Sequence, residues 1–134
     1  MANIAYFEIP ADNVDRAKRF YHDLLGWKIE PTRSMGDPAK MKAMQYQDVM
    51  TGAAKEGTMS MGGMYKRQMK ENIMNYVVVE DLDKVLAKLE KLGGKIAVPK
   101  MEIKGVGWTA IIMDTEGNAI GIWKPSMDMM KGMK

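Results

Sequence analysis

A five-residue segment in the first half of the chain recurs almost unchanged in the second half. Residues 25–29 read LGWKI and residues 92–96 read LGGKI, so the two copies lie 67 positions apart in a chain of 134 residues. A repeat at half the chain length predicts one structural unit that is written twice. Functional side chains are then expected at equivalent positions of the two halves.

Three further pairs of segments match in the same order along the two halves. The pairs are 6–9 (YFEI) with 76–79 (YVVV), 14–16 (VDR) with 82–84 (LDK), and 63–66 (GMYK) with 121–124 (GIWK). The separation falls from 70 residues in the first pair to 58 in the last. The first half is therefore expected to carry the longer loops.

Size and composition fit one core that both halves share. The chain has 134 residues, of which 46% are apolar and 28% charged, which is enough for one core and too little for two independent ones. The net charge of +3 is too small to indicate a nucleic-acid partner. Since neither a membrane-length apolar run nor a signal segment is apparent, we expect no membrane partner and a cytoplasmic location. The absence of cysteine excludes disulfides and thiolate chemistry.

The first half predicts the element order β-α-β-β-β. Residues 4–9 are apolar and aromatic and precede Pro10, as is typical of a strand that ends there. Asp12 or Asn13 would cap a helix that Gly26 terminates. Three more strands are expected at residues 27–30, 41–49 and 58–65.

The second half predicts the same order. A strand over residues 74–79 precedes Asp81, which would cap a helix that stops at the glycines at 93 and 94. The remaining strands are expected at residues 95–98, ended by Pro99, and at residues 108–113 and 119–124.

The predicted fold class is α+β. Two tandem βαβββ modules, residues 4–66 and 73–124, are expected to form a curved mixed sheet around a concave cleft, with the helices outside. They would make a single domain over residues 1–125, followed by a tail rich in Met and Lys at residues 126–134. The strand period of two assigns these side chains to the helix side: Phe7, Ile9, Val77, Val79, Ile120 and Ile122.

Alternate residues of the same strands are expected to face the cleft. Tyrosine and tryptophan combine broad apolar faces with a hydrogen-bonding tip, which is typical of a pocket for a flat or amphipathic small molecule. The predicted ligand-binding residues are Tyr6, Met61, Gly63, Tyr65, Met74, Tyr76, Gly121 and Trp123. The alternative is that the aromatic side chains only fill the hollow, and that the glycines mark bends in their strands rather than open space.

Glu8 is the ionisable residue that strand alternation turns toward the cleft. Burial among tyrosines and methionines would raise the pKa of its carboxyl and suit it to general acid or base catalysis. The alternative is a structural pairing with Lys66, Lys124 or a tyrosine hydroxyl. Glu8 is thus the candidate catalytic residue, without a partner base or nucleophile that the sequence reveals.

A set of short motifs runs in order along nearly the whole chain and leaves out only the tail from Ser126. The motifs are 7–12 (FEIPAD), 16–21 (RAKRFY), 25–27 (LGW), 51–52 (TG), 62–64 (GGM), 79–83 (VEDLD), 105–107 (GVG) and 114–118 (DTEGN). This ordered set resembles the vicinal oxygen chelate superfamily, which comprises glyoxalases, bleomycin resistance proteins and extradiol dioxygenases. The resemblance implies paired βαβββ modules whose concave sheet often holds a divalent metal.

The resemblance also implies where metal ligands would lie, because metal-using members place His, Gln or Glu on the first and fourth strands of each half. The matching positions here are Ile4 or Tyr6, Met74 or Tyr76, Gly63 and Gly121. A divalent metal needs three or more oxygen or nitrogen donors, which this set does not supply. The only histidine, His22, is expected on the flank or surface of the first helix. We therefore expect no metal and no other cofactor.

These features favour a metal-free protein that binds a small aromatic or amphipathic molecule in the cleft. The alternative is a lyase or dioxygenase-type enzyme of the same superfamily, with Glu8 as acid or base or with a displaced metal site. A scaffold or sensor module is a third hypothesis. The resemblance further implies a homodimer.

Overall fold

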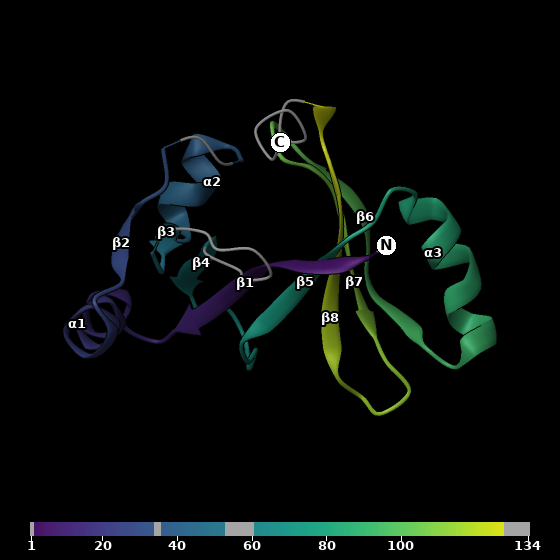
Figure 1. Cartoon of the computed structure of the whole chain (residues 1–134), viewed down its shortest axis with the longest axis horizontal. Coiled ribbons are helices and arrows are strands. Elements are labelled where there is room, and N and C mark those ends of the chain that lie inside the picture. The colour runs from purple at the N-terminus through teal and green to yellow at the C-terminus, as the bar shows by residue number, and fades with distance from the viewer. Residues whose placement is uncertain (1, 34–35, 53–60, 128–134) are drawn as a thin grey trace. The chain divides into compact units, whose positions relative to one another are not determined.

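The computed structural model describes residues 2–33, 36–52 and 61–127. The chain divides into two compact units, which we call the N-terminal unit (residues 5–73) and the C-terminal unit (residues 1–4 and 74–134). Each unit has the β-α-β-β-β order expected from the repeat, with one extra short helix in the first (Figure 1). The predicted α+β fold of two tandem βαβββ modules is therefore confirmed.

The N-terminal unit builds a mixed four-stranded sheet. Its elements are β1 (Asn3–Ala11), α1 (Val14–Leu25), β2 (Lys28–Pro31), α2 (Pro38–Ala43), β3 (Gln47–Met50) and β4 (Met61–Lys66). The strand order is β2-β3-β4-β1, with β1 parallel to β4 and the other pairs antiparallel. The side chain of Asn13 accepts a hydrogen bond from the backbone of Arg16, and Gly26 ends α1 with a φ of 74°. Both ends of this helix were predicted.

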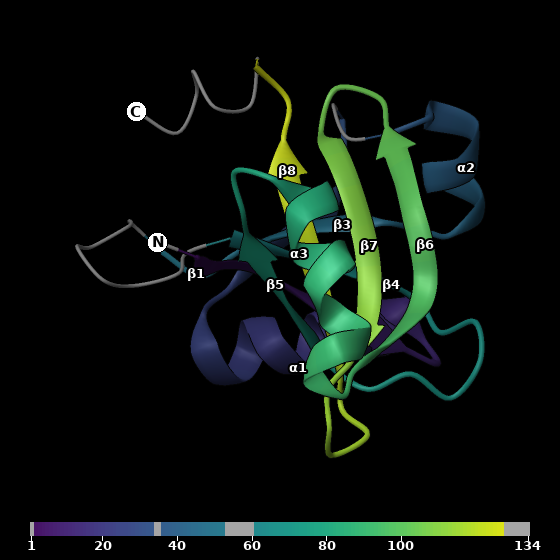
Figure 2. The same ribbon diagram turned by 90° about the vertical axis from the view of Figure 1, so that its right-hand side faces the viewer.

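The C-terminal unit repeats this design. Its elements are β5 (Met74–Val78), α3 (Leu82–Leu89), the 3-10 turn η1 (Glu90–Leu92), β6 (Lys95–Ile103), β7 (Gly107–Met113) and β8 (Ala119–Pro125). The strand order is β5-β8-β7-β6, and α3 lies across one face of this sheet (Figure 2). Asp81 caps α3 by accepting from the backbone of Lys84, as the sequence indicated.

The predicted strand over residues 41–49 is wrong in its first half. Residues Pro38–Ala43 form α2 instead, and β3 begins only at Gln47. Asp37 caps this helix through a hydrogen bond from the backbone of Ala39, with Pro38 in the first turn. A capping side chain followed by proline starts a helix locally, and this outweighs the apolar alternation further along. Of the predicted strand at 58–65, residues 58–60 lie outside the described residues, as do residues 128–134 of the predicted tail.

Two prolines lie inside strands that they were expected to end. β1 continues through Pro10 to Ala11, and β6 continues through Pro99 to Ile103. The Ala11 carbonyl accepts a hydrogen bond from the backbone N–H of Arg67, which follows β4. Because neighbouring residues of a strand point their backbone groups to opposite sides, the backbone of Pro10 points away from β4. The missing N–H of Pro10 therefore removes no hydrogen bond between β1 and β4. β6 is the last strand in its unit's order, and its register shifts between Ile96 and Met101 mark bulges that accommodate Pro99.

Each unit buries its own core between its sheet and its longer helix. In the N-terminal unit Phe7, Ile9 and Met64 pack with Val14 of α1. In the C-terminal unit Leu82 of α3 packs with Ala110 and Ile122, and the partly buried side chains against them include Val77, Val79 and Ile120. The predicted assignment of alternate strand residues to the helix side is therefore confirmed. Among the described residues, no helix is long and apolar enough to cross a bilayer.

Candidate functional site

One face of the N-terminal sheet carries three tyrosines and two carboxylates. The register of β1, β4 and β3 places Glu8 and Asp48 on either side of Gly63. Paired residues project from the same face, as do residues two positions along one strand. We call this surface the tyrosine face, and its members are Tyr6, Glu8, Tyr46, Asp48, Met61, Gly63 and Tyr65. The opposite face packs against α1.

Two tyrosines and Glu8 form a directed chain of hydrogen bonds. The Tyr46 hydroxyl donates to Oε2 of Glu8 at 2.8 Å, and the hydroxyls of Tyr6 and Tyr46 lie 2.7 Å apart. Because Tyr46 has a single hydroxyl proton and gives it to Glu8, Tyr6 must donate to Tyr46. Both phenol protons are therefore directed toward the Glu8 carboxylate.

Burial keeps both phenols of this chain protonated. It raises the pKa of the Tyr46 hydroxyl far above its usual value, and the negative charge of Glu8 raises it further. Burial also raises the pKa of Tyr6, where the hydrogen bond with Tyr46 opposes the shift and the charges of Glu8 and Asp48 add to it. At neutral pH the two phenols act as hydrogen-bond donors, and the Glu8 carboxylate is the acceptor at the end of the chain.

A tyrosine covers the fourth-strand glycine in each unit. A Cβ at Gly63 would overlap the Tyr46 hydroxyl and would lie 2.7 Å from the hydroxyl of Tyr6. In the C-terminal unit a Cβ at Gly121 would overlap the ring of Tyr76. The space that these glycines leave is therefore occupied by aromatic side chains of the same unit.

Tyr65 links the tyrosine face to the segment after β4. Its ring stacks on Tyr46 with centroids 6.4 Å apart and planes 8° apart, and its hydroxyl donates to Glu71 at 3.1 Å. Burial raises the pKa of Tyr65, and the charges of Glu71 and Glu8 add to this shift. Glu71 also accepts hydrogen bonds from the backbone N–H groups of Gln68 and Met69. These hydrogen bonds to the Glu71 carboxylate thus hold residues 68–71 next to Tyr65.

The stability supplied by Glu71 is expected to depend on pH. Burial alone would raise the pKa of Glu71, but hydrogen bonds from backbone N–H groups and from Tyr65 lower it overall, below its ordinary value of 4.5. A carboxyl whose pKa is lower in the folded than in the unfolded protein stabilises the fold at pH values above the unfolded-state pKa. This stabilisation is lost as the pH falls through the folded-state pKa. Glu71→Gln should therefore lower the urea midpoint at pH 7, with a gap to wild type that narrows below pH 4.5 and is smaller at pH 3 than at pH 7. A gap that is equally wide at both pH values would contradict this linkage.

The remaining predicted site residues lie in the C-terminal unit. Tyr76 pairs with Gly121 and Val78 with Trp123, so Met74, Tyr76, Gly121 and Trp123 share one face of that sheet. The Trp123 indole is buried, and its N–H donates to the Val106 carbonyl at 3.0 Å. The polar tip of Trp123 thus holds the loop between β6 and β7. The structure brings Tyr6, Glu8, Met61, Gly63 and Tyr65 together in the N-terminal unit.

Tyr46 and Asp48 are the members of the tyrosine face that sequence reasoning missed. Tyr46 precedes β3, and Asp48 lies within it, opposite Gly63. Val49 is fully buried on the helix side. Alternation counted back from this valine would have placed residues 46 and 48 on the other face.

The donors on the described residues do not suit a divalent metal. No group of three or more His, Cys, Asp or Glu side chains is placed to hold an ion in the described part of the chain. At the positions where the superfamily resemblance implies ligands, Gly63 and Gly121 lack side chains, and the protonated Tyr6 phenol is engaged with Tyr46. His22 is exposed on α1 next to Asp23, as predicted. The described residues at these positions therefore do not fit the divalent metal that the resemblance implies.

Comparison with known families gives a match along most of the chain. Residues 3–122 match the sequence profile described as the Glyoxalase/Bleomycin resistance protein/Dioxygenase superfamily. A "Glyoxylase-like domain-containing protein" from Didymella fabae is 31% identical over 122 residues, which cover 89% of this chain and 91% of that protein.

A second similar sequence is longer than this chain. The protein named "Putative glyoxylase CFP32" from Mycobacterium bovis is 26% identical over 126 residues, which cover 89% of this chain and 44% of that protein. The chain therefore spans less than half the length of this curated relative.

Solved structures share the fold at low sequence identity. Methylmalonyl-CoA epimerase from Mycobacterium tuberculosis superposes with a TM-score of 0.62 at 15% identity, over 96% of this chain and 91% of that one. A glyoxalase/bleomycin resistance protein/dioxygenase superfamily member from Vibrio splendidus 12B01 gives a TM-score of 0.61 at 8% identity, over 92% of this chain and 99% of that one. At such identities the likeness concerns the fold.

Proposed function

The chain belongs to the glyoxalase/bleomycin resistance protein/dioxygenase superfamily, and from this premise we propose that it binds a small aromatic or amphipathic molecule on the tyrosine face without a metal ion. One observation carries the proposal: the hydrogen-bond chain from Tyr6 through Tyr46 to Glu8. It lies over Gly63, at a place where the family resemblance implies a metal ligand.

The tyrosine face offers both an apolar wall and polar anchors. Tyr46 and Tyr65 are buried, Tyr6 and Glu8 are half-buried and Met61 is 50% exposed, so a ligand would meet the face at Tyr6, Glu8 and Met61. The half-buried ring of Tyr6 suits a flat ligand, because aromatic pairs contribute about 0.5–1.5 kcal/mol beyond their buried area. The carboxylates of Glu8 and Asp48 favour a ligand that brings hydrogen-bond donors or a positive charge.

The second candidate function is catalysis with Glu8 as general acid or base. The Tyr46 hydroxyl holds one oxygen of this carboxylate in a fixed direction, and such orientation is what proton transfer to or from a bound substrate requires. This is the enzyme hypothesis raised by the sequence. The two candidates differ in outcome, because a binding protein returns its ligand unchanged and an enzyme converts it.

The binding proposal is tested with two probes that share one ring and differ in charge. We expect 2-phenylethylamine to bind more tightly than phenylacetate at the tyrosine face, since the carboxylates of Glu8 and Asp48 attract the ammonium group. Isothermal titration and amide NMR shifts measure both. Glu8→Gln should weaken the binding of 2-phenylethylamine about tenfold, because a hydrogen bond to a charged group contributes about 1.5–3 kcal/mol. Asp15→Asn is the matched control, since it makes the same charge change at an exposed position of α1, which packs against the opposite face of the sheet.

Three results would overturn the proposal. The first is a stoichiometric divalent ion in protein purified without chelator that is lost in Glu8→Gln. The second is equal affinity of wild type, Glu8→Gln and Tyr6→Phe for 2-phenylethylamine. The third is conversion of a co-purified ligand that Glu8→Gln abolishes, which would establish the enzyme instead.

A further inference from the structure

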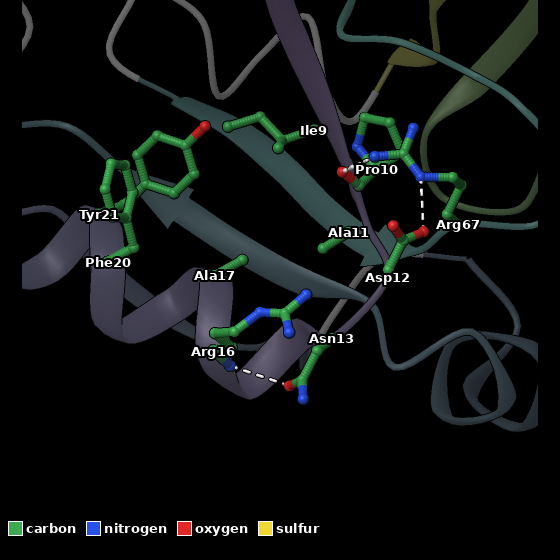
Figure 3. A pocket seen from close by; sticks show the side chains of 10 residues that line it. All are labelled: Ile9, Pro10, Ala11, Asp12, Asn13, Arg16, Ala17, Phe20, Tyr21 and Arg67. Atoms are coloured by element: carbon green, nitrogen blue, oxygen red, sulfur yellow. Dashed lines mark hydrogen bonds and ion pairs between the residues drawn. The ribbon is translucent and has the colours of Figure 1, made fainter.

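We propose that the N-terminal unit holds a second binding site, a pocket between α1 and the end of β1 that takes a small arylcarboxylate whose carboxylate pairs with Arg16. This pocket is lined by Ile9, Ala11, Ala17, Phe20 and Tyr21 on its apolar side and by Arg16 among its polar groups (Figure 3). It opens on the helix side of the sheet, whereas the tyrosine face is on the other side.

The apolar wall of the pocket is shaped for one aromatic ring. Tyr21 stacks on Trp27, with ring centroids 5.2 Å apart and planes 8° apart, so Trp27 holds the Tyr21 ring in place. Phe20 meets Tyr21 edge to face at 5.3 Å and is 58% exposed, which leaves an aromatic surface open to a ligand. Ile9 and Ala11 are buried and form the floor.

The pocket carries an excess of positive charge. Arg67 is held by its ion pair with Asp12 at 2.8 Å and reaches the Pro10 carbonyl at 3.4 Å. Within the described residues the Arg16 guanidinium has no hydrogen-bond or ion-pair partner, and Figure 3 shows it in the interval between α1 and Ala11. Since the Asp12 carboxylate offsets Arg67, the charge of Arg16 is left for a ligand. A guanidinium is suited to bind a carboxylate through two parallel hydrogen bonds.

The size of the pocket sets the size of the ligand. Its volume is about 370 Å³, at the lower end of the range of about 300–1,000 Å³ for small-molecule sites. One ring with a short acidic side chain fits this volume. Charge complementarity with Arg16 and the exposed ring of Phe20 thus indicate the same class of ligand.

The test is a titration of the isotope-labelled whole chain with phenylacetate, followed by amide NMR. We expect saturable shifts along α1 with a dissociation constant in the millimolar range, as suits so small a ligand. Arg16→Gln should weaken this binding about tenfold, because it removes a charged hydrogen-bonding partner. Arg19→Gln makes the same charge change on the same exposed helix outside the pocket and should leave the affinity unchanged.

The proposals for the tyrosine face and for the α1 pocket can be tested independently of each other. Glu8→Gln should not alter phenylacetate binding at α1, and 2-phenylethylamine should not shift the α1 amides. The inference is overturned by equal affinity of wild type and Arg16→Gln, by equal weakening in Arg19→Gln, or by saturable shifts confined to the tyrosine face. Amide shifts that rise linearly with phenylacetate up to about 50 mM would also overturn it.

Discussion

Gly63→Ala is expected to lower the free energy of unfolding by about 3 kcal/mol, at the upper end of the cost of overpacking a core. The reason is steric, because the new methyl group would overlap the Tyr46 hydroxyl and crowd that of Tyr6. The change would also break the hydrogen-bond chain that ends at Glu8. Urea unfolding followed by circular dichroism measures the effect.

Gly105→Ala is the comparison in which a backbone penalty acts without a clash, because Gly105 has a positive φ and Gly63 does not. Gly105 has a φ of 77°, and a Cβ there would meet nothing within 4 Å, so only the backbone cost of about 1–2 kcal/mol applies. Because the Tyr46 hydroxyl is the nearest obstacle, Gly63→Ala should cost less in a Tyr46→Phe background. An equal cost in both backgrounds would show that the Tyr46 hydroxyl does not contribute to the clash above Gly63.

Trp123→Ala is expected to cost about 3–5 kcal/mol, as is typical for truncating a large buried aromatic side chain. The indole is 7% exposed, and its N–H donates to the Val106 carbonyl. Removal would leave a cavity in the C-terminal unit and an unpaired carbonyl in the loop between β6 and β7. Thermal and urea unfolding measure the loss.

Trp123→Phe distinguishes an anchoring role from a ligand-binding one. It keeps much of the apolar volume but removes the hydrogen bond, whose net contribution is about 1 kcal/mol. If Trp123 mainly holds the loop, this variant should be mildly destabilised and should bind 2-phenylethylamine like wild type. A loss of affinity as large as that of Glu8→Gln would instead support the predicted ligand-binding role of Trp123.

Signals that act over a few residues were readable from the sequence. The caps at Asn13 and Asp81 and the stop at Gly26 are local hydrogen bonds and backbone conformations, and the structure has them where they were predicted. The assignment of Phe7 and Ile9 to the helix side follows from strand alternation alone. The prediction was wrong where a helix-starting signal, Asp37–Pro38, competed with the apolar alternation that follows it. It was also wrong at Pro10 and Pro99, because whether a strand tolerates proline depends on the position of that proline in the sheet.

The sequence by itself determined the duplicated α+β fold, because its repeat, its caps and its apolar periods are written within each half. Only the tertiary structure decided what surrounds Glu8. Its partner Tyr46 lies 38 positions away, and the glycine beneath them belongs to a third segment. Whether Glu8, Tyr46 and Gly63 come together depends on the register of β1, β4 and β3, and no local sequence pattern specifies that register. The same register puts phenols where the repeat had suggested open space above Gly63.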